Sequence, residues 1–386
     1  MIQRIMEEEI RDSFLDYFGG IEDPRSPRNQ RHQFAEILFL VLSANISGAE
    51  SWKDIEQFGK THIAWLKQFF SYKNGIPSDD TLRRVFRALN PNIFQEKFRK
   101  WVADALPHFQ ENVFAIDGKT SRGSTDGEGD EERTIHMISA YATESNLVLA
   151  QEKVADKSNE ITAIPKLLEW LDLRGATVTI DAMGCQHKIA DQIVNQEGKY
   201  VLALKGNQCS LHDDVTIIFQ DEEFLQHCET FEMTNKGHGR VETRKAFVLK
   251  DIAWLRERHP QWQTIQSVIR LDSKRKIKGI VSEETRYYVS SEELTASKAI
   301  SIIRSHWAIE NSVHWVLDMS FGEDQSRIRQ QNAPQNMAIV RHIALNLIKM
   351  TKNKNERYKH HSIKCIRKMA GWNTDVLNDV LSQNFS

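Results

Sequence analysis

Two aspartates each follow a run of β-branched and other apolar residues and are themselves followed closely by glycine. Asp117 ends the run over residues 113–116, and Asp181 ends the run over residues 177–180. Apolar runs without polar alternation are typical of buried central strands, so each aspartate is expected where a strand ends. Two carboxylates on neighbouring strands repel each other unless a cation lies between them, which suggests a metal site. A plain Asp-Gly turn is the alternative at either position.

A third carboxylate, Glu310, lies in a segment rich in Trp, Ile and Val that predicts one long helix over residues 296–318. His306, Glu310 and His314 recur every four residues and share one helical face. A zinc site is not favoured, because the HExxH pattern is absent. A buried carboxylate needs a partner, and a metal ion shared with the two aspartates would provide one.

The elements predicted around the two aspartates follow one another in an order that limits the fold. Residues 136–142 and 147–151 predict a hairpin, 159–171 and 187–196 predict helices, and 200–204 predict a strand. The order is therefore β-β-β-α-β-α-β, and right-handed crossovers place the fourth strand beside the first. This predicts an α/β fold with a ribonuclease-H-like core, a mixed sheet flanked by helices, in which Asp117 and Asp181 are neighbours.

The segments before and after this part of the core differ from it in predicted secondary structure. Residues 1–108 are predicted to form a helical N-terminal domain, and 109–205 the first part of the core. Short β-like runs predict a mainly β insertion over 206–292, and 293–386 hold the long helix and a basic helical C-terminal part.

Two basic elements are candidates for DNA binding. Arg83, Arg84 and Arg87 lie on a helix that follows the polar cap at residues 77–81, and the second helix of such a pair can enter a DNA groove. Arg240 lies in a glycine-containing basic loop over 236–244 that suits a backbone phosphate. An ordinary helix pair and a solvated hairpin are the alternatives.

Composition limits the class of protein. The chain of 386 residues is long enough for two or three domains, and no apolar run reaches the 18 or more residues of a membrane span. The acidic start and four cysteines without CxxC spacing indicate a cytoplasmic protein. The net charge is −2, but residues 325–386 carry +8, including Lys349, Lys352 and Lys354. This basic segment is a predicted phosphate-binding surface, with a solvated helical face as the alternative.

Several short motifs, in one order, resemble those of a known family. They occupy residues 75–81, 84–86, 115–120, 157–161, 179–186, 204–208, 306–311 and 321–324. The chain resembles DDE-type insertion-sequence transposases, specifically the branch that includes the enterobacterial H-repeat-associated proteins, nearly from end to end. The resemblance implies an acidic triad of Asp117, Asp181 and Glu310 as catalytic residues and metal ligands.

The resemblance also implies cofactors, partners and chemistry. Three carboxylates suit two Mg²⁺ ions, with Mn²⁺ as a substitute. The implied reaction is hydrolysis of a phosphodiester at a transposon end, followed by attack of the freed 3′-OH on target DNA. Lys119 and Lys205, next to the strand ends, are expected to contact phosphates of double-stranded DNA, with solvated lysines as the alternative. Synapsis of two ends implies a homodimer or larger assembly, in the bacterial cytoplasm at the nucleoid.

The pattern departs from the wider superfamily at three places. Where that superfamily often has Tyr and Arg before the glutamate and Lys after it, this chain has Ile303, His306 and Leu317. Asp318, Glu323 and Asp324 are therefore alternatives to Glu310, which is preferred because it lies well inside the helix.

Two rival functions fit the same fold: a nuclease or junction resolvase without strand transfer, and a domesticated DNA-binding protein that no longer transposes. The β insertion and helical N-terminal region favour a transposase over a plain nuclease. The presence of all three carboxylates argues against a domesticated protein.

Overall fold

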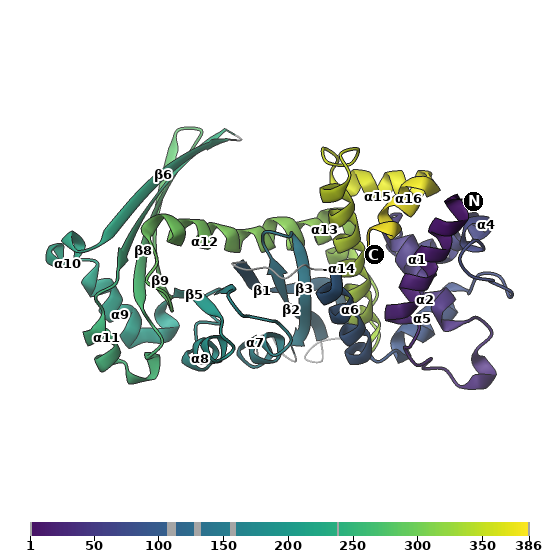
Figure 1. The fold of residues 1–386 in the computed structure, drawn as a ribbon, viewed down its shortest axis with the longest axis horizontal. Helices are drawn as coiled ribbons and strands as arrows, with labels where there is room; N and C mark the ends of the chain where they lie inside the picture. The colour runs from purple at the N-terminus through teal and green to yellow at the C-terminus, as the bar shows by residue number, and fades with distance from the viewer. Residues whose placement is uncertain (1, 106–112, 127–132, 155–159, 238, 385–386) are drawn as a thin grey trace.

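The computed structural model describes residues 2–105, 113–126, 133–154, 160–237 and 239–384. Within these residues, one mixed sheet of nine strands runs through the middle of the molecule (Figure 1). The strand order is β3-β2-β1-β4-β5-β9-β8-β7-β6. The first five strands are β1 (Val113–Asp126), β2 (Arg133–Ala142), β3 (Leu147–Val154), β4 (Thr177–Ile180) and β5 (Lys199–Leu204).

These five strands have the arrangement predicted from the sequence. β1, β2 and β3 are successively antiparallel, whereas β4 pairs in parallel with β1, and β5 in parallel with β4. The crossovers contain α7 (Glu160–Leu168) and α8 (His187–Asn195). The ribonuclease-H-like core, with its fourth strand beside its first, is confirmed.

Helices cover both faces of this core, which explains why all four residues of β4 are buried. α7 and α8 lie on one side, and α12 (Ala296–Ile309) crosses the other side of the sheet (Figure 1). A π-helical turn over Glu310–His314 joins α12 to α13 (Trp315–Phe321), so the long helix predicted over 296–318 is present but interrupted.

The strands of the predicted insertion continue the core sheet rather than standing apart from it. β9 (Ile280–Ser290) pairs antiparallel with β5, and β8 (Ser267–Ile277), β7 (Arg240–Leu249) and β6 (Glu229–Gly237) follow outward. The segment also contains helices that the sequence did not predict: α9 (Cys209–Ile218), α10 (Glu222–Gln226) and α11 (Ala253–Arg258).

The N-terminal helices and the C-terminal helices share one bundle at the far end of the sheet (Figure 1). Arg367 donates to the carbonyl of Asn45 at 2.7 Å, and Trp65 donates its indole N–H to Asn378 at 3.0 Å. None of the described helices is long and apolar enough to cross a membrane. The N-terminal helices are α1 (Ile2–Phe18), α2 (Phe34–Ile46), α3 (Trp52–Thr61), α4 (Ile63–Leu66), α5 (Asp79–Ala88) and α6 (Pro91–Ala105). The C-terminal helices are α14 (Ala333–Lys354), α15 (Ile363–Trp372) and α16 (Thr374–Leu381).

Candidate active site

Asp117 and Asp181 are neighbours because β1 and β4 run in parallel with Ile116 opposite Ile180. The adjacency predicted from strand order is therefore confirmed. One detail was wrong: Asp117 does not end its strand, since β1 continues to Asp126 paired with β2. The strand that ends here is β4, whose last residue is Ile180. Because β4 does not continue beside β1, Asp117 faces a cavity.

Glu310 reaches the same place from the opposite layer. It begins the π-helical turn that follows α12, and π turns of this kind often occur at functional sites. Together with Asp117 and Asp181, it lines a cavity of about 520 Å³. Its side chain is on the exposed side of the helix, so the expectation of a buried third carboxylate was wrong.

The electrostatics of the cavity favour a cation. Burial, followed by the negative charges of Asp181, Glu310 and Glu160, raises the pKa of Asp117 to about 7. Burial also raises the pKa of Asp181. Carboxylates that repel one another in this way are stabilised when a positive charge lies among them, and their oxygen atoms are the ligands that Mg²⁺ prefers.

The two histidines near Glu310 have other partners. His306 Nδ1 lies 3.0 Å from Thr179 Oγ1, and His314 Nδ1 lies 3.4 Å from Asp117 Oδ2. Burial lowers the pKa of His306 to about 4 and that of His314 to about 3, so both are neutral near pH 7. In the described parts of the chain, no three His, Cys, Asp or Glu side chains stand close enough together to hold a metal ion. The carboxylates share a cavity, but they do not form a closed coordination shell.

Glu160 is a fourth carboxylate near the pair, and the sequence reasoning assigned it no role. It is the first residue of α7, its charge raises the pKa of both aspartates, and it contacts His136 Nε2. A Cβ on Gly118 would lie 2.5 Å from Glu160 Oε1 and 2.8 Å from His136 Nε2, so a larger residue after Asp117 would require this pair to shift. The motif over 157–161 was the available signal; residues 157–159 lie outside the described residues.

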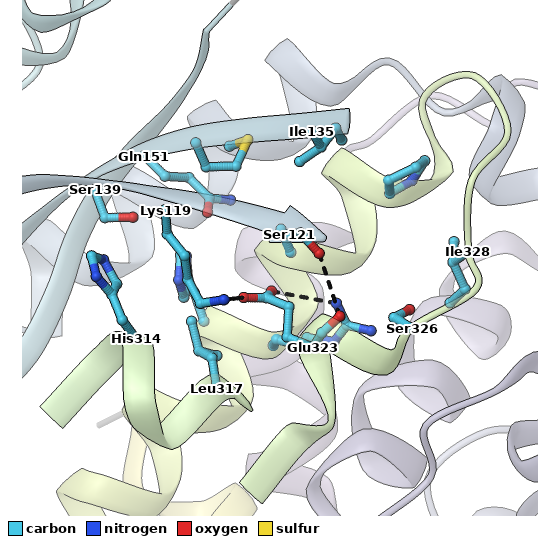
Figure 2. Close-up of a pocket in the computed structure, with 15 residues that line it drawn as sticks. Lys119, Ser121, Ile135, Ser139, Gln151, His314, Leu317, Glu323, Ser326 and Ile328 are labelled. Carbon is cyan, nitrogen blue, oxygen red and sulfur yellow. Dashed lines mark hydrogen bonds and ion pairs between the residues drawn. The ribbon is translucent and has the colours of Figure 1, made fainter. Parts of the chain in front are cut away.

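Lys119 lies in a cluster of carboxylates, contrary to the prediction that it contacts a phosphate. Its ammonium is 2.6 Å from Asp318 Oδ1, 3.3 Å from Glu323 Oε2 and 3.4 Å from Asp324 Oδ1. Figure 2 shows the Lys119 side chain pointing from the strand toward Glu323. Only 11% of this side chain is exposed, so its charge is used inside the protein.

The same contacts decide between the alternative third carboxylates. Lys119 holds Asp318, Glu323 and Asp324, and Glu323 also lies 3.3 Å from Arg341 Nη1 in the interior. None of these three lines the cavity that contains Asp117 and Asp181. Their placement favours Glu310 as the third member.

The cavity wall supplies cationic and aromatic side chains. Lys205, which follows β5, lines it as predicted for a residue on this rim. Arg286 and Trp307 also line it, with the guanidinium 4.9 Å from the centre of the indole ring. Neither residue was predicted to bind: Arg286 lies outside the motifs, and Trp307 lies in the 306–311 motif, where only Glu310 was given a role.

The three predicted lysines of the basic C-terminal segment differ in their exposure. Lys349 is 7% exposed, and its Nζ has no hydrogen-bond partner among the described residues, so it cannot contact DNA as predicted. Lys352 is half-buried and Lys354 is exposed at the end of α14. Of the three predicted lysines, only these two remain available to a phosphate.

The other predicted DNA-binding arginines lie at the surface. In α5, Arg83 is 3.3 Å from Asp79, Arg84 is 3.5 Å from Asp80, and Arg87 Nε donates to Gln331 at 3.4 Å. Arg240 is exposed at the start of β7.

Comparison with known proteins shows the family to which the chain is similar. Residues 15–102 match the family model described as DDE_Tnp_1-associated, and residues 108–347 match the model described as Transposase DDE domain. The "Putative transposase YncI" of Escherichia coli O157:H7 is 38% identical over 96% of this chain and 94% of its own length. The "H repeat-associated putative transposase YhhI" of Escherichia coli K12 is 40% identical over 86% of this chain and 89% of its own length.

A solved structure, a cryo-EM synaptic complex of piggyBac transposase with hairpin DNA, aligns with 98% of this chain and 78% of that chain. Its TM-score is 0.41 and its sequence identity 8%, too low to bear on the fold. The family matches cover most of the chain, including the strands and the helix that carry Asp117, Asp181 and Glu310. This protein therefore belongs to the family of transposases with a DDE domain.

Proposed function

We propose that this transposase hydrolyses a phosphodiester bond at each end of its element and then transfers the freed 3′-OH to target DNA. One observation carries the proposal: Asp117, Asp181 and Glu310 come from β1, the end of β4 and the helix across the sheet, yet all three line one cavity of about 520 Å³. A cavity of this size admits a nucleotide while the sheet holds two of the carboxylates rigidly.

The chemistry of the donor set, three carboxylates on the wall of one cavity, suits hard divalent cations. Asp117, Asp181 and Glu310 would hold two Mg²⁺ ions, or Mn²⁺ in their place, whose charge would stabilise the attacking and leaving oxygens of the phosphate. The raised pKa of Asp117 supports this assignment, because burial first and then the charges of neighbouring carboxylates disfavour its ionised form, and a cation among them would relieve that repulsion. Neutral His314, at 3.4 Å, orients the Asp117 carboxylate.

The proposed substrate is double-stranded DNA, both the element ends and the target. Lys205 lies on the cavity wall and supplies a positive charge beside the carboxylates. Joining two ends requires at least a homodimer, and the proposed compartment is the bacterial cytoplasm, where the nucleoid lies.

Single variants Asp117→Asn, Asp181→Asn and Glu310→Gln test the proposal. The substrate is DNA that spans one end of the element, incubated with Mg²⁺ and separated on a denaturing gel. Each variant is expected to lose cleavage by about 1,000-fold or more, equal to about 4 kcal/mol of barrier, while still binding the DNA. Asp12→Asn is the matched control, because this exposed aspartate of α1 lies outside the cavity.

A second DNA added as target separates the remaining functions. Joined products indicate a transposase, whereas cleavage without joining indicates a nuclease or resolvase. Binding without cleavage by the unaltered protein would contradict the proposed chemistry.

A further inference from the structure

The outer ends of β6, β7, β8 and β9 project past α12 as a four-stranded ribbon, which we call the arm (residues 233–237, 240–244, 273–277 and 280–286; Figure 1). Side chains alternate between the two faces along a strand, and residues paired across strands share a face. At the base of the arm, Ala246 and Ile269 belong to one buried cluster with Ile300 and Ile303 of α12. The face that continues this cluster outward is the inner face of the arm, on the side of α12.

The pairing register sorts the charges of the arm by face. Continuing outward from Ala246, the inner face contains Arg244, Glu242 and Arg240 on β7. Glu242 pairs with Arg275 of β8, which therefore lies on the inner face as well. The inner cationic residues are Arg240, Arg244, Arg275 and Arg286, and the outer ones are Lys236, Lys274 and Lys276. Arginine thus occupies the side of the catalytic helix, and lysine occupies the back.

Two of the inner arginines are not neutralised. Arg244 lies 2.8 Å from Glu242, and Arg286 lies 2.7 Å from Glu284. Arg240 and Arg275 are exposed and form no ion pair with any residue that the structure describes. A folded protein does not need these two charges for its own stability, so they are available to an anionic partner.

The inner face leads directly to the catalytic cavity. Arg286 lies at its base and stacks at 4.9 Å on Trp307, and both residues line the cavity that contains Asp117 and Asp181. From Arg286 outward to Ile280 the strand spans about 20 Å, at roughly 3.3 Å per residue. That length corresponds to about six phosphates along one DNA strand, at about 3.4 Å each.

We propose that the inner face of the arm binds the backbone of the double-stranded DNA whose scissile phosphate lies in the cavity. This rests on the proposed function and adds to it the surface that holds the DNA. Guanidinium groups match phosphate oxygens with two parallel hydrogen bonds, whereas lysines on the back remain solvated point charges. Because the contacts are to phosphate, the arm fixes the position of the duplex without reading its sequence.

The arm also supplies a matched pair of variants for the test. Arg240→Ala/Arg275→Ala removes two exposed, unpaired charges from the inner face. Lys236→Ala/Lys276→Ala removes two exposed charges, also without an ion pair among the described residues, from the outer face. Both variants change the net charge equally, so a difference in their DNA affinity shows which face of the arm contacts the DNA. Thermal unfolding by circular dichroism checks that both fold like the unaltered protein.

Binding of a fluorescent 30-base-pair duplex is measured by anisotropy over a range of salt concentrations, with the unaltered full chain and both variants, without divalent metal. The inner variant is expected to bind about tenfold or more weakly and to flatten the salt slope by about two units. The outer variant is expected to stay within about twofold of the unaltered protein.

Three results would overturn the proposal for the arm. Equal loss in both variants would mean that only net charge matters, and no loss in the inner variant would place the DNA elsewhere. A shift of the inner variant from dimer to monomer in sedimentation, with DNA affinity unchanged, would mean that the exposed Ile277 and Ile280 at its tip mark an interface with a second copy. In all three, cleavage by the unaltered protein would leave the proposed function intact, whereas an unaltered protein that binds no DNA would contradict both.

Discussion

The Lys119 ammonium lies 2.6 Å from Asp318 Oδ1 and so joins β1, two residues after Asp117, to the helix that carries Glu310. The two residues are 199 positions apart in the chain. Lys119 and Asp117 share one strand, and Asp318 and Glu310 lie in one helical segment across the sheet. The ion pair therefore fixes the position of Glu310 relative to Asp117.

Lys119→Met is expected to lower both stability and cleavage. The substitution leaves Glu323 with Arg341 as its one cationic partner among the described residues, and loss of one member of a buried pair costs roughly 3 kcal/mol. Urea unfolding measures the first effect, and cleavage of element-end DNA in Mg²⁺ measures the second. Lys119→Arg should restore part of both, and exposed Lys53→Met is the control.

The competing interpretation of Lys119, as a phosphate contact, makes a different forecast. It would give unaltered stability together with weaker DNA binding and a flatter salt slope. That combination would contradict the positioning role.

Gly118→Ala is expected to reduce cleavage while the protein stays folded. The new Cβ would lie 2.5 Å from Glu160 Oε1 and 2.8 Å from His136 Nε2, so this pair must move away from the aspartates. Disturbing partners that orient metal-binding carboxylates typically costs about 10- to 100-fold in activity. Gly206→Ala is the control, because its added Cβ meets no atom within 4 Å. Equal activity of the two variants would remove Glu160 and His136 from the site.

Lys349→Met is expected to stabilise the protein near neutral pH. Burial lowers the pKa of Lys349 to about 7 in the folded state, whereas an unfolded lysine has a pKa of about 10.4. Between these values the unfolded state binds the extra proton, so the stability of the unaltered protein should rise as the pH rises from 7 to 10. The variant should lack this rise and gain a few kcal/mol near pH 7.

One contact opposes the lowering of the Lys349 pKa. The Lys349 Nζ lies 4.6 Å from the centre of the Tyr141 ring, which favours the charged form. We expect burial to dominate, because this nitrogen has no hydrogen-bond partner among the described residues. Urea unfolding at pH 7 and pH 9, with exposed Lys354→Met as control, distinguishes the two. A Lys349→Met variant that is less stable at both pH values would show that the cation–π contact prevails.

The core of the fold could be predicted because its signals are local. Apolar runs at 113–116 and 177–180 mark buried strands, and the handedness of crossovers then makes Asp117 and Asp181 neighbours. The π turn at Glu310 could not be predicted, since an extra residue in a helical turn leaves the apolar pattern almost unchanged.

The predictions for two lysines were wrong for a different physical reason. Charge counts treat every lysine as exposed, but Lys119 and Lys349 are placed by contacts with residues far away in the chain. The continuation of the sheet through β9 also depends on a long-range pairing, between Val201 and Ser290, that no local motif signals.

The arginines of α5 supply the last prediction, which concerns recognition of the element ends. Arg83 and Arg84 are held by Asp79 and Asp80 at the start of the same helix, which leaves them at the surface but partly neutralised. If α5 reads bases, replacing Arg83, Arg84 and Arg87 by Ala should reduce the preference for end DNA over scrambled DNA, with each lost base contact worth about 1–3 kcal/mol.

The acidic partners of these arginines allow the opposite change. Asp80→Asn should free Arg84 and increase affinity for both DNAs, because a neutralising carboxylate is removed. Anisotropy with end and scrambled duplexes measures both effects, and Lys60→Ala on the neighbouring α3 is the control. If the triple variant loses affinity for the two DNAs equally, α5 contacts phosphates only, and sequence recognition must lie on another element.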